Sequence, residues 1–194
     1  MAPIFPVCFE ASDLGTWRIE RIDPARGASL PPAARLAAHT GPVAPPPGAA
    51  SAWRLRGTAG HQRYVDRLEK AALARVQPPL NRPEATRAAL IPIKKVDAWW
   101  ELAQDERRAI FEDGSHHIAA GMKYLPAVAR RLYHSRELGE PFDFLAWFEY
   151  APQHLHEFED LVGTLRATEE WHYIEREVDI RLERIARPGR PTQG

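Results

Sequence analysis

The segment from His116 to His134, HHIAAGMKYLPAVARRLYH, changes its hydrophobic period at Pro126. Before the proline the apolar residues have helical spacing, and from Ala127 to His134 they alternate with polar residues, as in a strand. Proline disfavours helical backbone at the residue before it, so we expect the helix to end by Leu125. A helix that runs directly into a strand, followed by the turn residues 139–141 (Gly-Glu-Pro), predicts an antiparallel sheet with helices on one face.

The remaining segments fit the same α+β class. Period-two alternation predicts strands and helical spacing predicts helices; the expected strands are 16–22, 51–64, 86–94, 127–134, 142–150 and 171–185, and the expected helical segments are 65–76, 97–122 and 152–166. Residues 30–50, rich in proline, alanine and glycine, predict a surface loop outside the core. Pro92 predicts that its strand lies at a sheet edge or ends there.

Two α+β repeats are therefore expected. The N-terminal repeat, residues 1–85, is abbreviated and contains a proline-rich loop at 41–50. The C-terminal repeat spans residues 86–185, and residues 186–194 form a flexible tail.

The composition excludes several classes of partner. Lys+Arg and Asp+Glu are equal at 26 each, so nothing indicates a nucleic-acid-binding surface. The single cysteine, Cys8, excludes an intramolecular disulfide and a cysteine-based zinc or iron–sulfur site. No segment has the roughly 18 apolar residues of a membrane span, and the N-terminus lacks the pattern of a secretory signal. We expect a cytoplasmic protein with no membrane partner, although a chain whose signal had been removed would look the same.

Two side chains in the opening segment are candidates for one site. His117, in the helical part, has an imidazole that can ligate a metal, and Arg130 follows thirteen residues later in the strand part. Alternation puts Arg130 on the side of Val128 and Leu132, and Arg131 on the other side. Taken alone, an arginine pair is more often surface charge, and a lone histidine is more often structural. A helix and a strand can still approach one pocket from opposite sides, as an axial ligand and a charged group over a flat cofactor require.

Longer matches elsewhere in the chain give a specific resemblance. The stretches WWELAQDERR, HHIAAGMKYLPAVARRLYHS, GEPFDFLAWFEYAP and LRATEEWHYIEREV resemble the chlorite dismutase family of haem b proteins. The likeness runs from about Trp17 to Arg184, and it is nearest to the short, typically dimeric branch because the N-terminal half is abbreviated. It implies a dimeric α+β barrel, in which two ferredoxin-like repeats form an antiparallel β-barrel with helices outside. It also implies haem b, with its iron, as the cofactor and a homodimer as the assembly.

The resemblance assigns roles to individual residues. The family's proximal histidine precedes a Tyr-Leu pair by seven positions, which implies that His117, and not His116, ligates the haem iron. Glu170 matches the carboxylate that accepts a hydrogen bond from the ligand's other ring nitrogen, and Arg130 matches the distal arginine. The other expected haem contacts are a tryptophan pair, polar groups on the propionate side and apolar walls: Trp99 and Trp100, Lys95 and Tyr64, and Leu132 and Phe144, with Trp99 also forming part of the wall.

The implied function is that of a chlorite dismutase (chlorite O2-lyase), which splits chlorite into chloride and dioxygen with O–O bond formation. Arg130 would attract the anion and hold the chlorine-oxide fragment until the oxygens combine. Two alternatives stay open. One is a coprohaem decarboxylase of the same superfamily, whose members lack an arginine at this distal position; the other is a haem-binding barrel without catalysis. Longer family members have another tryptophan where this chain has Glu177, which agrees with the short, dimeric branch.

Overall fold

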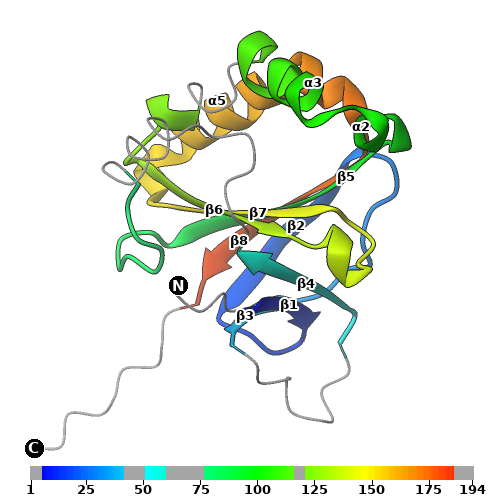
Figure 1. Ribbon diagram of the computed structural model, residues 1–194. Helices are drawn as coiled ribbons and strands as arrows, with labels where there is room; N and C mark the ends of the chain where they lie inside the picture. The colour runs from blue at the N-terminus through cyan, green and yellow to red at the C-terminus, as the bar shows by residue number, and fades with distance from the viewer. Residues whose placement is uncertain (1–5, 42–50, 60–76, 116–120, 186–194) are drawn as a thin grey trace, which may run out of the picture.

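The computed structural model describes residues 6–41, 51–59, 77–115 and 121–185, and eight strands in these ranges form a closed antiparallel barrel (Figure 1). The strands are β1 (Pro6–Ser12), β2 (Trp17–Arg26), β3 (Arg35–Thr40), β4 (Trp53–Ala59), β5 (Arg87–Lys95), β6 (Val128–His134), β7 (Phe144–Tyr150) and β8 (Ile174–Arg184). Their order around the barrel is β1-β3-β2-β8-β5-β7-β6-β4. Each half, β4-β1-β3-β2 and β8-β5-β7-β6, has the strand order of a ferredoxin-like unit, which confirms the predicted α+β barrel of two repeats.

The two halves meet at two unequal seams. Along the first, β2 pairs with β8 from Trp17 opposite Arg184 to Arg26 opposite Glu177. Along the second, the described residues of β4 and β6 pair where Thr58 lies opposite His134 and Ala59 lies opposite Tyr133. Over the ranges that the structure describes, the second seam is therefore the shorter of the two.

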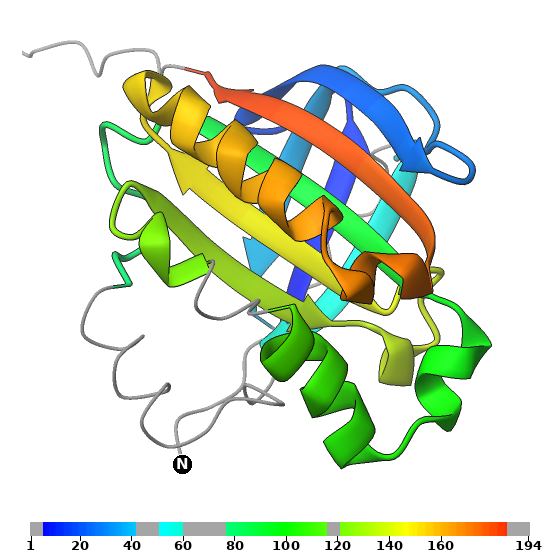
Figure 2. The ribbon, with the colours of Figure 1, turned by 90° about the horizontal axis from the view of Figure 1, so that it is seen from above.

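The apolar residues form two cores, one on each side of the sheet. The interior core fills the barrel with side chains from both halves, including Phe9, Trp147 and Ile180. The rings of Phe9 and Trp147 stack there with their centroids 5.2 Å apart. The outer core lies between α5 (Leu155–Arg166) and strands β5, β6 and β7, and contains Ala89, Ile91, Val128, Phe148, Tyr150, Phe158, Leu161 and Val162. Figure 2 shows α5 crossing the strands of the C-terminal half.

The other helical segments are short. They are α2 (Asp97–Glu101), α3 (Gln104–Arg108), the π-helical turn η1 (Ala109–Gly114), and the short 3-10 turns η2 (Arg136–Leu138), η3 (Pro152–His154) and η4 (Glu169–Tyr173). Figure 1 shows α2, α3 and α5 on one side of the barrel, while β1, β3 and β4 lie on the far side. Within the part of the chain that the structure describes, no helix is long and apolar enough to span a membrane.

Two expectations about the strands were wrong. The predicted loop at 30–50 contains β3, whose Leu36 is fully buried in the interior core, because β3 pairs along its length with β1. Pro92 does not mark an edge, since β5 lies between β8 and β7. Pro92 pairs with Leu145 of β7, while the β5–β8 pairs pass from Leu90 to Ile93, so the residue without an N–H lies where no β5–β8 pair forms.

Several predictions lie outside the described residues or stay predictions. The predicted helix at 65–76, most of the proline-rich loop and the tail at 186–194 are not among the described ranges. The division of the chain at 85/86 stays a prediction, although β4 ends at Ala59 and β5 begins at Arg87.

Candidate functional site

A buried ion pair joins the end of β5 to η4. Nζ of Lys95 lies 2.6 Å from Oε1 of Glu170, and the Lys95 side chain is 2% exposed. The same ammonium lies over the ring of Trp99, 4.3 Å from its centroid. Burial lowers the pKa of Lys95, while the Glu170 carboxylate opposes this shift. These contacts give the ammonium of Lys95 two partners within the protein, Glu170 and Trp99. Its contact with a haem propionate stays a prediction.

The surroundings of this pair fix the backbone on both sides of it. The backbone N–H of Lys95 donates to Oδ2 of Asp143 at 2.7 Å, and burial raises the pKa of Asp143 while this hydrogen bond opposes the shift. On the other side, the backbone N–H of Glu170 donates to Oγ of Ser115 at 3.3 Å. Ser115 lies two residues before His117 in the sequence. The structure thus brings Glu170 to the end of the segment that contains the expected iron ligand.

The two tryptophans of α2 have different neighbours. Trp99 is 1% exposed, and the ring of Tyr173 packs edge-on against it with centroids 5.3 Å apart. Trp100 stacks on Phe144 at 5.9 Å, and the guanidinium of Arg136 lies 3.9 Å from its ring centroid. Trp99 therefore belongs with the Lys95–Glu170 pair, whereas Trp100 and Phe144 form a separate aromatic stack.

Arg130 lies on the outer face of β6. Val128 packs in the outer core, and the alternation of the strand gives Arg130 and Leu132 the same face, as predicted. A Cβ on Gly121, in the helical residues 121–123, would collide with the Arg130 guanidinium. Burial lowers the pKa of Arg130, and the carboxylate of Glu112 opposes this shift, but a guanidinium stays charged at physiological pH.

Three neighbours of Arg130 were missed from the sequence. Phe148, 6% exposed, lies directly opposite Arg130 in the β6–β7 register. Nε2 of Gln77 donates to the carbonyl oxygen of Arg130 at 2.5 Å, and Glu112 on η1 is close enough to act on its charge. The alternation in FDFLAWFEY indicates a face that contains Phe148, but only the strand register shows that this face meets Arg130. The same register puts Phe144 opposite His134, farther along β6.

These residues fit a haem as judged by their chemistry. An axially ligated iron cofactor needs a carboxylate behind the histidine, a charged group for an anionic ligand and apolar walls. The Glu170–Lys95 pair and Arg130 supply the first two. Leu132 is 47% exposed on the same face of β6 as Arg130, which gives apolar surface beside Arg130. The expected iron ligand His117 and the propionate-side Tyr64 lie outside the described residues.

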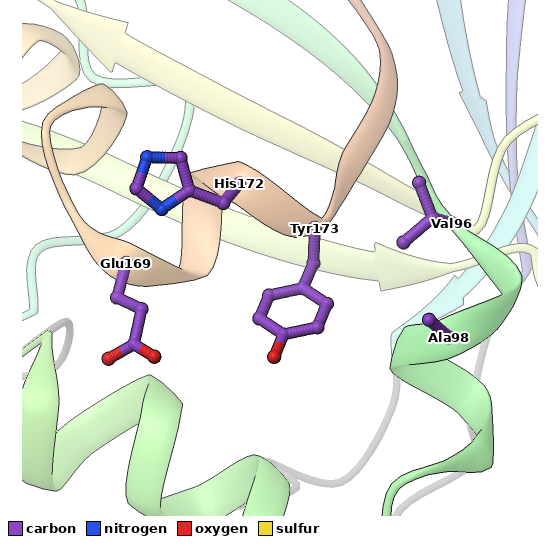
Figure 3. A pocket seen from close by; sticks show the side chains of 5 residues that line it. All are labelled: Val96, Ala98, Glu169, His172 and Tyr173. Atoms are coloured by element: carbon purple, nitrogen blue, oxygen red, sulfur yellow. The ribbon is translucent and has the colours of Figure 1, made fainter.

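A pocket of about 320 Å³ opens between η4 and α2 (Figure 3). Figure 3 shows Glu169 and Tyr173 extending from η4 to the same side, with Val96 and Ala98 across the pocket. Its lining residues are Val96, Ala98, Glu169, His172 and Tyr173. The charged side chains described above do not line this pocket, so we do not assign the cofactor to it.

The chain is similar to known proteins over most of its length. Residues 54–185 match a family model described as chlorite dismutase. A dimeric chlorite dismutase from Nitrobacter winogradskyi is 62% identical, over 92% of this chain and 99% of that chain, with a TM-score of 0.84. A variant of the chlorite dismutase from Candidatus Nitrospira defluvii is 30% identical, over 70% of this chain and 56% of that chain, with a TM-score of 0.58. Another variant of that enzyme, 21% identical over 94% of this chain and 91% of that chain, has a TM-score of 0.61 and shows likeness of fold alone.

Proposed function

Because the chain belongs to the chlorite dismutase family, we propose that it is a haem b-dependent chlorite dismutase, which converts chlorite to chloride and dioxygen. Haem b, when bound, supplies the redox chemistry that breaks the O–Cl bond and joins the two oxygens. The protein's own residues hold the cofactor, bind the anion and exclude water. The single observation that supports this best is Arg130, a half-buried guanidinium on the outer face of β6, which it shares with Val128 and Leu132.

Arg130 is the anion-binding residue of this proposal. A guanidinium has five N–H donors and a permanent charge, so it can bind chlorite through charge-assisted hydrogen bonds. Its low-dielectric surroundings strengthen that attraction relative to water. The same donors can hold the chlorine-oxide fragment close until the oxygens combine, which keeps hypochlorite from escaping. The hydrogen bond from Gln77 to the Arg130 carbonyl oxygen restricts the backbone of Arg130. Phe148, opposite Arg130 on β7, restricts one side of its side chain.

Glu170 and Lys95 act on the opposite side. We place His117 as the iron ligand and Glu170 as the acceptor for the proton on its other ring nitrogen, which fixes the tautomer and the ring orientation. The ammonium of Lys95, 2.6 Å from Oε1 of Glu170, forms an ion pair that holds this carboxylate in place. Trp99, Leu132 and Phe148 exclude water from the two sides of the site, while Trp100 and Phe144 form a wall farther along.

The assembly proposed is a homodimer. The Nitrobacter winogradskyi relative is dimeric and aligns with this chain over nearly its whole length. We therefore expect light scattering of the purified protein to give the mass of two chains of 21.9 kDa. A stable monomer or a pentamer would contradict this assignment.

The activity is tested with Arg130→Ala, and Arg131→Ala is the matched control. The two arginines are adjacent on β6, and Arg131 is exposed and faces away from Val128. On the haem-loaded wild type, an oxygen electrode should record dioxygen release from chlorite. Arg130→Ala should keep haem and lose about 10²–10³ in rate, the usual effect of removing one preorganised donor. It should also release more hypochlorite, measured with an added hypochlorite trap, and its haem should bleach sooner. Arg131→Ala should behave as the wild type.

Two results would contradict the proposal. A wild type that takes up haem but releases no dioxygen would exclude chlorite dismutase activity. If it instead converted coprohaem to haem b under peroxide, the decarboxylase would be the better assignment. Equal oxygen yield and equal bleaching in Arg130→Ala and Arg131→Ala would show that Arg130 does not hold the fragment.

A further inference from the structure

The turn that contains Glu170 is short and lies partly exposed. η4 spans only Glu169–Tyr173, between the end of α5 and the start of β8; none of its residues is fully buried, and the side chain of Glu170 is 13% exposed. Its backbone N–H at Trp171 donates to the carbonyl oxygen of Thr168 at 3.2 Å. Contacts from outside the turn must therefore hold Glu170 in place.

One buried carboxylate, Glu177 on β8, accepts hydrogen bonds from residues on both sides of Glu170 in the sequence. Glu177 is 3% exposed. Its Oε2 accepts a hydrogen bond from Nε1 of Trp171 at 2.8 Å, immediately after Glu170. Its Oε1 accepts one from Nε of Arg166 at 2.7 Å, at the last residue of α5. Because a charged acceptor binds both donors, each hydrogen bond is stronger than one between neutral groups.

A second strand supports Trp171 from the other side. Arg26 on β2 lies opposite Glu177 in the β2–β8 register. Its guanidinium lies 5.2 Å from the Trp171 ring centroid, and its Nη1 donates to the Trp171 carbonyl oxygen at 3.2 Å. Trp171 is thus held between a cation and an anion that belong to adjacent strands of the barrel.

We propose that Glu177 is a positioning residue, which acts through Trp171 to hold η4 so that the Glu170 carboxylate stays against Lys95 and behind the iron ligand. The proposal rests on the function proposed above and names a residue that sets the geometry of that site. This positioning role can be separated from any role of Glu177 in anchoring α5, because Arg166 at the end of α5 also donates a hydrogen bond to Oδ2 of Asp179 at 3.0 Å. Without Glu177 the helix end keeps one acidic partner, but Trp171 loses its acceptor.

The decisive variant is Trp171→Phe, which keeps an aromatic ring beside Arg26 and removes the indole N–H together with the five-membered part of the indole. The chain offers a matched control, since Nε1 of Trp147 donates to Oε1 of Glu149 at 2.9 Å in the interior core. Trp147→Phe removes an equivalent indole–carboxylate hydrogen bond far from η4 in the sequence. Asp179→Asn is a second control, which weakens the anchoring of α5 and leaves Trp171 and Glu177 intact.

The first measurement uses the haem-free protein. In Trp171→Phe, the backbone amides of residues 169–171 should exchange with solvent about three- to tenfold faster, the factor that one hydrogen bond represents. Trp147→Phe and Asp179→Asn should leave these rates unchanged. Equal exchange in Trp171→Phe and the wild type would show that Glu177 does not hold the turn.

The second measurement is the ferric/ferrous potential of the haem-loaded protein, with Glu170→Gln as the reference. A looser or neutral partner gives the ligand less anionic character, so both Glu170→Gln and Trp171→Phe should raise the potential, the latter less. Neither control should change it. A raised potential in Glu170→Gln alone would overturn this inference and leave the proposed function intact. A wild type that takes up no haem would overturn both.

Discussion

Replacing Lys95 with methionine should destabilise the haem-free protein strongly. Methionine keeps the apolar stem but removes the ammonium that lies 2.6 Å from Oε1 of Glu170. The side chains of Lys95 and Glu170 are only 2% and 13% exposed, so water cannot take over the role of the lost cation. Breaking a buried pair from one side costs about 3–5 kcal/mol, because the remaining charge loses the partner that offset its burial. The contact of the ammonium with Trp99 at 4.3 Å contributes within that total.

Lys94, the residue before Lys95 on β5, gives the control. Nζ of Lys94 lies 2.7 Å from Oε1 of Glu175, almost the same distance, but these side chains are 41% and 47% exposed. An exposed pair contributes about 0–1 kcal/mol, so Lys94→Met should change the free energy of unfolding by no more than that. The two ion pairs have nearly the same N–O distance, so a difference in unfolding free energy between the two variants reports the effect of burial.

Urea unfolding of the haem-free variants measures both effects. The double variant Lys95→Met/Glu170→Gln should recover about 2 kcal/mol or more relative to Lys95→Met, since the second change removes the stranded charge. A loss of less than about 1 kcal/mol in Lys95→Met, or no recovery in the double variant, would refute the claim that the two charges depend on each other.

Three other predictions concern stability. Burial raises the pKa of Asp179, but hydrogen bonds and charges from Arg181 and Arg166 outweigh burial, and the net pKa is lowered. Asp179 therefore stabilises the fold above its ordinary pKa of 3.8. This stability is lost as the pH falls through the lowered pKa. Urea unfolding at pH 2–5 should show a smaller loss with acid in Asp179→Asn, and an unchanged slope would contradict the assignment. In the barrel, Gly57→Ala should lose about 1–3 kcal/mol, because the new Cβ would lie 2.7 Å from Cβ of Tyr133. Gly163→Ala on α5, where nothing lies within 4 Å, should gain about 0.5–1 kcal/mol by the same measurement, and a loss there would show that helix propensity does not decide this position.

The elements predicted correctly are those with a strong local period. The alternation after Pro126 was sufficient to predict β6 and the face that Arg130 shares with Val128, because side chains of one strand alternate whatever the strand pairs with. β1 has the same period, with Val7, Phe9 and Ala11 buried in the interior core, although no strand was predicted there.

The contacts that build the site could not be predicted in this way. Lys95 and Glu170 are 75 positions apart, and only the packing of η4 against the end of β5 brings them together. β3 has a single large apolar side chain, Leu36, so nothing local distinguishes it from the surrounding loop. Its pairing with β1 stabilises it, and such pairing is a property of the whole barrel.

The two seams of the barrel differ in the pairing that their described residues make. Separating the described residues of β4 from β6 breaks the pairing at Thr58 and Ala59, whereas separating β2 from β8 breaks a ladder that extends from Trp17 to Arg26. Transient opening that leaves both halves folded is therefore expected at the shorter seam. Such an opening would expose the edge of β6, the strand of Arg130, while the β2–β8 seam keeps the two halves together as a hinge.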